Sequence, residues 1–388
     1  MSRWQRCEFE PVDVIVNADG RPLDSSYGFE GPLTPAPFSG AVRTAILRDK
    51  GLTDPLASDP GGVRQVLGVP HKGPPAASAA YRFAGAWPQS RAGEPLLPAP
   101  AFVLRDPFGT LLPRPVQAEG LRAWDHADGL PSLLGTPGVK RGHVEDRLLP
   151  LSLLSVVLGG DQTVSGRAFR NLVLSPVRAE RRFGHRRAPT GAPETHMLFS
   201  RGVLRSAEAM QCGKPFLASW VGFIRGVDSL LPADGSLLRV GGDGRRAAFR
   251  QTPADLGPVA RLGADVSKAV AGGHREVLVY LATPAVFSAG WRPGELPGLE
   301  LVSAAVGPPF PLSGWDYHHN RPKPQRLAVH AGSTYFYRVT DTAAAALTLT
   351  QLHFNDSICD DLSDGLSGFG MCLAGLLSVP TREDGERQ

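Results

Sequence analysis

The sequence predicts an α+β protein built on antiparallel sheets. Patterns typical of strands dominate the second half of the chain, few helices interrupt them, and no strand–helix–strand unit repeats along it. The chain has 388 residues, enough for two domains. Its 45 Gly and 36 Pro predict many turns and argue against a helical bundle. The element count leaves room for a β-α-β-β-α-β unit in each half.

The first half carries one clear strand signal and one clear helix signal. Val12, Val14 and Val16 alternate with Asp13, Ile15 and Asn17, which predicts a strand that ends at a turn at residues 19–20. After a Pro- and Gly-rich loop over 28–37, Ser39 is expected to cap a helix that runs to Lys50. A second helix is predicted over 144–158. Residues 53–137 are dense in Pro and are expected to form an irregular insertion.

The second half alternates more regularly. Strands are predicted over 196–204, 236–240, 276–283, 333–340 and 346–354, with one helix over 258–272. A Gly-rich break at 159–166 is expected to separate the domains. We therefore expect an N-terminal domain over 1–160, which contains the insertion 53–137, and a C-terminal domain over 161–388, which contains a glycine-rich segment at 365–375.

Composition excludes several classes of protein. With 42% hydrophobic and 20% charged residues, the chain has enough apolar material for a packed core. No stretch approaches 18 consecutive apolar residues, and no apolar segment follows the first basic residues, so neither a membrane span nor a secretion signal is expected. The four Cys at 7, 212, 359 and 372 form no disulfide or zinc pattern, which favours a reducing, cytoplasmic location.

The positive charge is mild but comes almost entirely from arginine. The net charge is +4, and only six of the 41 basic residues are Lys. Arginine forms forked, bidentate hydrogen bonds to phosphate, which favours a nucleic-acid partner. A GC-rich genome explains the same bias equally well.

The densest glycine cluster lies near the end of the chain, with Gly365, Gly368, Gly370 and Gly375 within eleven residues. Glycines let a backbone approach phosphate closely and present N–H groups to an anion. The spacing fits neither a dinucleotide-binding fingerprint nor a serine-hydrolase elbow. The alternative is a plain turn between two elements.

Two segments combine basic and aromatic residues. Residues 314–326 place Arg321, Lys323 and Arg326 near two aromatic residues, a composition that suits single-stranded nucleic acid. Residues 178–187 hold five Arg and one acid. For each segment the alternative is a solvated surface loop.

Nothing in the sequence calls for a metal or a cofactor. His318 and His319 are adjacent, so both cannot easily reach one metal ion, and Asp356, Asp360, Asp361 and Asp364 match no calcium loop. No phosphate-binding loop of the Gly-x-x-x-x-Gly-Lys-Ser/Thr type occurs.

Five segments in order resemble the third subunit of the type III-B CRISPR effector module, a member of the RAMP superfamily. They are residues 37–46, residues 180–205, residues 281–291, residues 314–336, and Gly368-Phe-Gly370 with Gly375, which matches the C-terminal glycine-rich loop of the superfamily. Together they span most of the chain. Residues 53–137 match nothing in the family.

The resemblance implies two ferredoxin-like domains of the RNA-recognition type and a non-catalytic role. The expected partners are the 5′ repeat-derived handle of a guide RNA, the large polymerase/cyclase subunit and the first backbone subunit. Gly368, Gly370 and the helix face that bears Gly40 and Arg43 are expected to meet the handle, and Arg182, Lys323 and Arg326 are added from their charge. The acidic stretch 356–364 is expected to repel phosphate or to face a protein.

Two other functions remain open. A RAMP-type endoribonuclease that processes repeat RNA needs a general base, usually His, beside the 2′-hydroxyl. The first His of the chain, His71, lies outside the predicted first helix. A purely protein-binding module is the third possibility, and it predicts no contact with RNA.

Overall fold

The computed structural model describes most of both halves of the chain. It covers residues 4–17, 34–52, 62, 66–67, 81–105, 111–113, 142–143, 147–160, 173–174, 177–206, 208–211, 214–217, 219–316 and 321–377. Within these residues, no helix has the length and apolar character needed to cross a membrane.

The first large sheet has five strands in the order β15-β16-β1-β14-β3, all paired antiparallel. The strands are β1 (Gln5–Pro11), β3 (Arg82–Pro88), β14 (Trp220–Arg225), β15 (Leu237–Arg239) and β16 (Arg246–Thr252). Helix α1 (Ala36–Asp49) supplies Phe38, Val42 and Ile46 to a core shared with this sheet. At its centre the ring of Phe9 lies 5.1 Å from that of Phe38.

The second large sheet has four strands in the order β18-β23-β17-β24, again all antiparallel. They are β17 (Glu276–Leu281), β18 (Leu299–Ala305), β23 (Thr334–Val339) and β24 (Cys372–Leu376). Helices α3 (Leu151–Leu158), α5 (Gly257–Ala271) and α6 (Thr342–Leu352) contribute to the core around this sheet. The two sheets meet through Trp87, whose indole N–H donates to the carbonyl of Ala282 at 2.7 Å.

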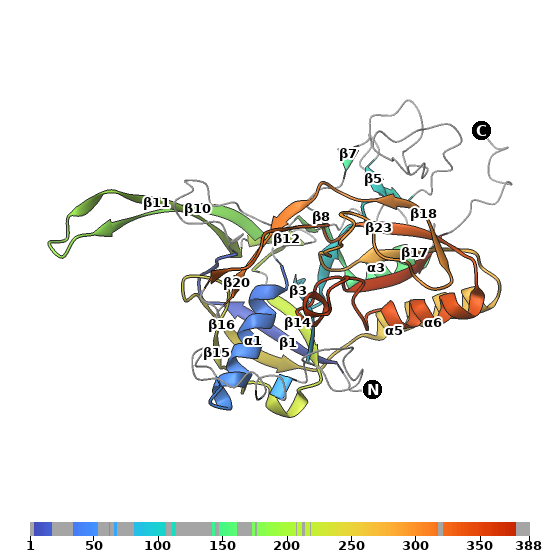
Figure 1. Cartoon of the computed structure of the whole chain (residues 1–388), viewed down its shortest axis with the longest axis horizontal. Coiled ribbons are helices and arrows are strands. Elements are labelled where there is room, and N and C mark those ends of the chain that lie inside the picture. Colours follow the sequence, from blue (N-terminus) through green and yellow to red (C-terminus); the bar gives the residue numbers. More distant parts are fainter. Residues whose placement is uncertain are drawn as a thin grey trace.

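A long hairpin projects from the body of the molecule (Figure 1). It is formed by β10 (Val177–Arg187) and β11 (Pro193–Ser206), and β2 (Val14–Ile15) pairs with β11 at its root.

Smaller ladders complete the described chain. They comprise β4 (Leu96–Pro98), β8 (Arg147–Pro150) and β9 (Val173–Leu174); β5 (Val103–Arg105), β6 (Leu111–Pro113) and β7 (Gly142–His143); β12 (Glu208–Gln211) and β13 (Lys214–Leu217); β19 (Phe310–Leu312) and β22 (Arg326–Ala328); β20 (Trp315–Asp316) and β21 (Arg321–Pro322). The helical turn η1 (Asp228–Leu230) lies between β14 and β15, and α7 (Leu362–Leu366) precedes β24.

The predicted fold class is confirmed, since helices and antiparallel sheets share the chain. The ferredoxin-like detail stays a prediction. The second sheet has four strands with a helix between the third and the fourth, as a β-α-β-β-α-β unit requires. Between its first two strands, however, residues 282–298 form no helix.

The sheets do not divide the chain at residue 160. Strands β14, β15 and β16, at 220–252, complete the first sheet, although the expected boundary assigns them to the C-terminal domain. Conversely, α3 lies before that boundary, and its residues Leu154 and Leu158 are buried in the core of the second sheet. A Gly-rich break predicts a turn but not a domain boundary. The sheet that a strand joins depends on its pairing partners, which lie far away in the sequence.

Several local predictions are wrong in informative ways. Residues 346–354 were expected as a strand, but α6 occupies 342–352, and its buried positions 345, 348, 349 and 352 have helical spacing. Alternating Thr and Leu residues there have the pattern of a strand. Asp341 precedes them and caps the helix. Helix α1 begins at Ala36, so Ser39 lies inside it, with its hydroxyl 3.1 Å from that of Tyr81. In the helix expected over 144–158, β8 occupies 147–150 instead.

Candidate nucleic-acid interface

The glycine-rich segment is buried between the two large sheets. Gly368 has a φ of +99°, and an added Cβ would lie 2.9 Å from both Phe83 on β3 and Pro35 before α1. Phe369 is 4% exposed and packs with Val286, Phe310, Leu312 and Ala328. These glycines are needed because the backbone passes too close to its neighbours for a side chain.

The N–H groups of this segment already have partners inside the chain. That of Gly368 donates to the carbonyl of Gly365 at 3.1 Å, that of Phe369 to Asp364 at 3.0 Å, and that of Gly370 to Pro284 at 2.7 Å. A backbone donor used in this way cannot also bind phosphate. The predicted anion nest is therefore not formed by these amides, and an RNA contact at Gly368 and Gly370 stays a prediction.

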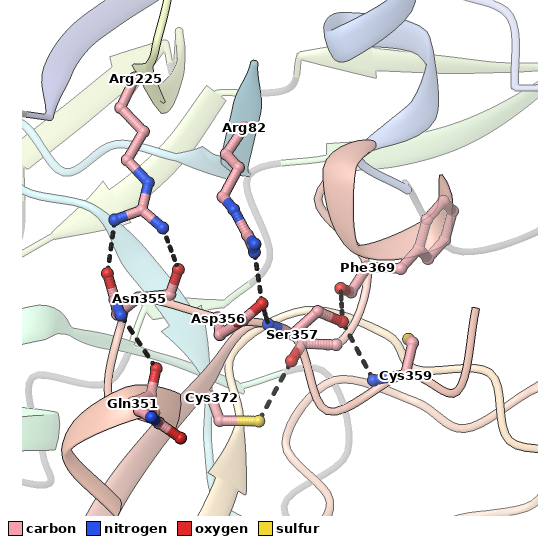
Figure 2. A network of polar contacts seen from close by, with 10 residues as sticks. Arg82, Arg225, Gln351, Asn355, Asp356, Ser357, Cys359, Phe369 and Cys372 are labelled. Atoms are coloured by element: carbon pink, nitrogen blue, oxygen red, sulfur yellow. Dashed lines mark hydrogen bonds and ion pairs between the residues drawn. The ribbon is translucent and has the colours of Figure 1, made fainter. Parts of the chain in front are cut away.

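The acidic stretch 356–364 holds the junction of the two sheets together (Figure 2). Arg82 on β3 forms an ion pair with Asp356, and Arg225 on β14 binds both the side chain and the carbonyl of Asn355. Burial, and then the neighbouring charge of Arg82, lowers the pKa of Arg225. These guanidinium groups are committed inside the molecule, so neither is available to a nucleic acid.

Asp364 and Arg326 form a second internal pair. Both guanidinium Nη atoms of Arg326 donate to the carboxylate of Asp364, at 2.6 and 2.7 Å, and the Asp364 side chain is only 7% exposed. Arg326 was predicted to bind RNA from its charge. The structure instead shows its fork facing a buried carboxylate, which neutralises it.

The remaining acids of that stretch are also engaged. The carboxylate of Asp360 accepts from the backbone N–H and the hydroxyl of Ser288, both at 2.6 Å, and Asp361 caps α7 by accepting from Ser363 at 2.7 Å. The stretch therefore makes internal contacts. Within the described residues, no group of three or more His, Cys, Asp or Glu is placed to hold a metal ion. His318 and His319 lie outside those residues.

The hairpin presents two unlike faces. Residues 178, 180 and 182 of β10 lie on one face, and residues 181, 183 and 185 lie on the other. The register of the ladder shifts between His185 and Arg187, so Arg187 lies beyond this alternation. At the root of the hairpin, the first face packs towards the body, because Val203 is buried with Val14 and Val16 in a small apolar cluster. We call this the inward face and the opposite one the outward face.

Arg182, a predicted RNA contact, lies on the inward face and is paired. Its two Nη atoms donate to the carboxylate of Asp13 at 3.1 and 3.3 Å, and its Nε donates to Glu180 at 3.2 Å. These bonds raise the pKa of Arg182, and the Arg182 bonds chiefly hold the pKa of Asp13 below its usual value. Arg182 therefore ties the hairpin to the body.

The outward face is basic, aromatic and exposed. Arg181 and His185 are exposed, Phe183 is 70% exposed, and none of the three has a side-chain partner among the described residues. Arg187, beyond the register shift, is exposed as well. Successive residues on one face of a strand lie about 6.7 Å apart. A cationic group beside an open aromatic ring forms a surface on which a phosphate and a base can bind together. The alternation of basic and aromatic residues is present in the sequence. The neighbouring arginines, however, give the segment the pattern of a uniform charge run.

The other predicted residues lie on helix α1 and in the loop between β21 and β22. Arg43 on α1 is half-buried, and its guanidinium carbon lies 5.8 Å from the ring centroid of Tyr81. An added Cβ at Gly40 would meet no atom within 4 Å, so this side of α1 is open. The side chain of Lys323 is exposed, while its backbone is held by Gly314 and Ser313, each at 2.8 Å.

Residues 7–377 match the family described as CRISPR-associated protein (Cas_Cmr3). Among solved structures, one described as the type III-B Cmr-beta bound to cognate target RNA and AMPPnP, state 1, contains a chain that is 12% identical over 85% of this chain and 86% of that chain, with a TM-score of 0.43. Another, described as the type III-B Cmr-beta bound to cognate target RNA, contains a chain that is 13% identical over the same shares, with a TM-score of 0.41. No curated protein matches the chain.

Proposed function

Because the chain belongs to the Cas_Cmr3 family of CRISPR-associated proteins, we propose that it is a non-catalytic subunit that binds the 5′ repeat-derived handle of a guide RNA. The family match confirms the relationship expected from the five sequence segments. We further propose that it docks against the large polymerase/cyclase subunit and the first backbone subunit of the module.

The outward face of the hairpin is the observation that supports RNA binding. An aromatic side chain that is 70% exposed gains nothing from the core of its own chain, and here Arg181 precedes it at the spacing of alternate strand positions. We propose that a base stacks on Phe183 while phosphates pair with Arg181 and Arg187. Stacking tolerates any base, so this contact holds the strand without reading its sequence.

Arg43 and Lys323 are proposed as additional contacts. Each presents a cationic group that no carboxylate of the described chain neutralises, unlike Arg182 and Arg326. The expected affinity for RNA therefore comes from a few free cations and one aromatic ring. For a single strand, log affinity falls with log salt by about 0.7 per phosphate neutralised.

The direct test is Phe183→Ala, measured by fluorescence anisotropy with a guide RNA labelled at its 5′ end. Loss of one stacked base is expected to weaken binding by about 1–3 kcal/mol. The matched control is Leu347→Ala on α6, which truncates another exposed apolar residue (61% exposed) away from the hairpin. Equal affinities for Phe183→Ala and the unchanged protein would refute this surface as the RNA site.

The non-catalytic part of the proposal has its own test. Repeat RNA incubated with the purified protein, with and without EDTA, is expected to stay intact on a denaturing gel. Cleavage that disappears on changing one His would support the endoribonuclease instead.

A further inference from the structure

Four arginines from three segments gather at the root of the hairpin. Arg178 and Arg182 come from β10, Arg205 comes from β11, and Arg245 comes from the turn between β15 and β16. Their acidic neighbours are Asp13 and Glu180. We call these six residues the root cluster.

The carboxylates hold the guanidinium groups in place. Besides Arg182, Asp13 accepts from Nη1 of Arg245 at 2.7 Å, and Glu180 lies 3.7 Å from Nη1 of Arg205. The side chains of Asp13, Arg182 and Arg245 are each about one-third exposed. Long side chains that are already ordered lose less entropy when they bind a further anion.

The positive charge of the root cluster exceeds what these acids can balance. Arg178 is exposed without a partner in the described chain and lies directly opposite Arg205 in the β10–β11 ladder, a placement of like charges that destabilises a sheet. The Nε–H of Arg245 is shielded from solvent and finds no acceptor among the described residues. Both features favour the binding of a further anion at the root cluster.

We propose that the root cluster is a phosphate-binding site for the RNA strand, in which a backbone phosphate competes with Asp13 for the guanidinium groups of Arg182 and Arg245. This inference rests on the proposed function, because it needs RNA on the outward face of the same hairpin. In this proposal the RNA strand passes over the edge of the hairpin, from the outward face to the root cluster on the inward face. Arginine forks suit phosphate better than a single carboxylate, since they accommodate several oxygens at once.

The first test is Arg245→Gln, because Arg245 belongs to the body rather than to the hairpin. RNA affinity is expected to fall about two- to fivefold, and the slope of log affinity against log salt should become shallower by about 0.7. The matched control is Arg261→Gln, an exposed arginine on α5 at the opposite side of the molecule (Figure 1), which should change neither quantity. Identical behaviour of the two variants would overturn the site.

The second test is Asp13→Asn, which keeps the shape of the side chain and removes the competing charge. The site predicts about two- to fourfold tighter binding of guide RNA and a steeper salt slope. Unchanged or weaker binding would mean that Asp13 only anchors the hairpin, and it would overturn the competition. Thermal unfolding of each variant checks that the protein is folded.

The two proposals fail in different ways. If Phe183→Ala weakens binding but Arg245→Gln equals Arg261→Gln, the root cluster is not a phosphate site and the proposed function stands. If Phe183→Ala has no effect, the outward face is not the RNA site, and the root cluster loses the premise on which it rests. If Arg245→Gln lowers affinity for a glutamate-rich peptide and leaves RNA binding intact, the root cluster serves an acidic protein instead.

Discussion

The glycine-rich loop and the projecting hairpin each differ from what their composition suggests. The loop is buried and bonded within the chain, whereas the hairpin exposes basic and aromatic side chains. The loop has the composition of an anion-binding nest, yet its N–H groups donate to carbonyls of the same chain and Phe369 is buried. The charge run at 178–187 has the composition of a solvated loop, yet it lies in a strand that holds Phe183 in solvent beside Arg181. A residue binds a ligand readily when its donors or its ring are not already used within the fold, and otherwise only in competition with its partner inside the chain.

Substitution of Gly368 is expected to give the largest effect and tests the loop side of this comparison. Gly368→Ala places a Cβ against Phe83 and Pro35 at a positive φ, and should cost about 3–5 kcal/mol in the free energy of unfolding. Gly290→Ala is the control, because its φ is +76° but its Cβ would meet nothing within 4 Å, so about 1–2 kcal/mol is expected. Urea titration compares them, and equal losses would contradict the packing role.

The next effect separates two basic residues of one segment. Arg326→Gln leaves the buried carboxylate of Asp364 without its cation and should cost about 2–4 kcal/mol of stability. Lys323→Gln removes an exposed charge and should change stability by no more than about 0.5 kcal/mol. Denaturant titrations measure both variants. If the Lys323 variant is the less stable of the two, the structural role assigned to Arg326 is contradicted.

The smallest effect is a pH dependence beside the glycine-rich loop. His353 is half-buried, its Nδ1 accepts from the N–H of Ala374 at 3.0 Å, and its Nε2 lies 2.8 Å from the carbonyl of Val259. Burial lowers its pKa, so the unfolded chain binds a proton more readily than the folded one. Stability from this group is present above about pH 6.5 and falls as the pH drops below that value.

His353→Gln should therefore flatten the change in urea midpoint between pH 7.5 and 5.5. His330, whose pKa burial also lowers, remains in the variant and accounts for part of the dependence that is left. A variant whose midpoint shifts as much as that of the unchanged protein would show that His353 does not titrate in this way.

Local patterns predicted much of the secondary structure. Alternation at 276–283 and 333–340 matches β17 and β23, and the helix expected at 258–272 is α5, at 257–271. The prediction failed at 346–354, where one pattern fits both the period of a strand and the period of a helix. Alternating Leu and Thr are typical of a strand, but they also place Leu349 and Leu352 on one face of α6.

The candidate site was only partly predictable. Arg43 and Lys323 present charge that no acid of the described chain neutralises, but Arg182 and Arg326 were chosen for a charge that Asp13 and Asp364 neutralise. Asp364 lies 38 positions from Arg326 and Asp13 lies 169 from Arg182, so no local pattern links either pair. The ring of Phe183 was overlooked because exposure depends on what packs nearby.

By itself, the sequence determined the class of fold, the periodicity of the strands and the family, since each depends on residues close together or in a fixed order. The tertiary structure alone decided which donors stay free. The amide of Gly370 faces Pro284, and Arg225 faces Asn355, because distant strands place them there. Whether a polar group binds a ligand is decided by competition with partners inside the chain, and folding sets the outcome of that competition.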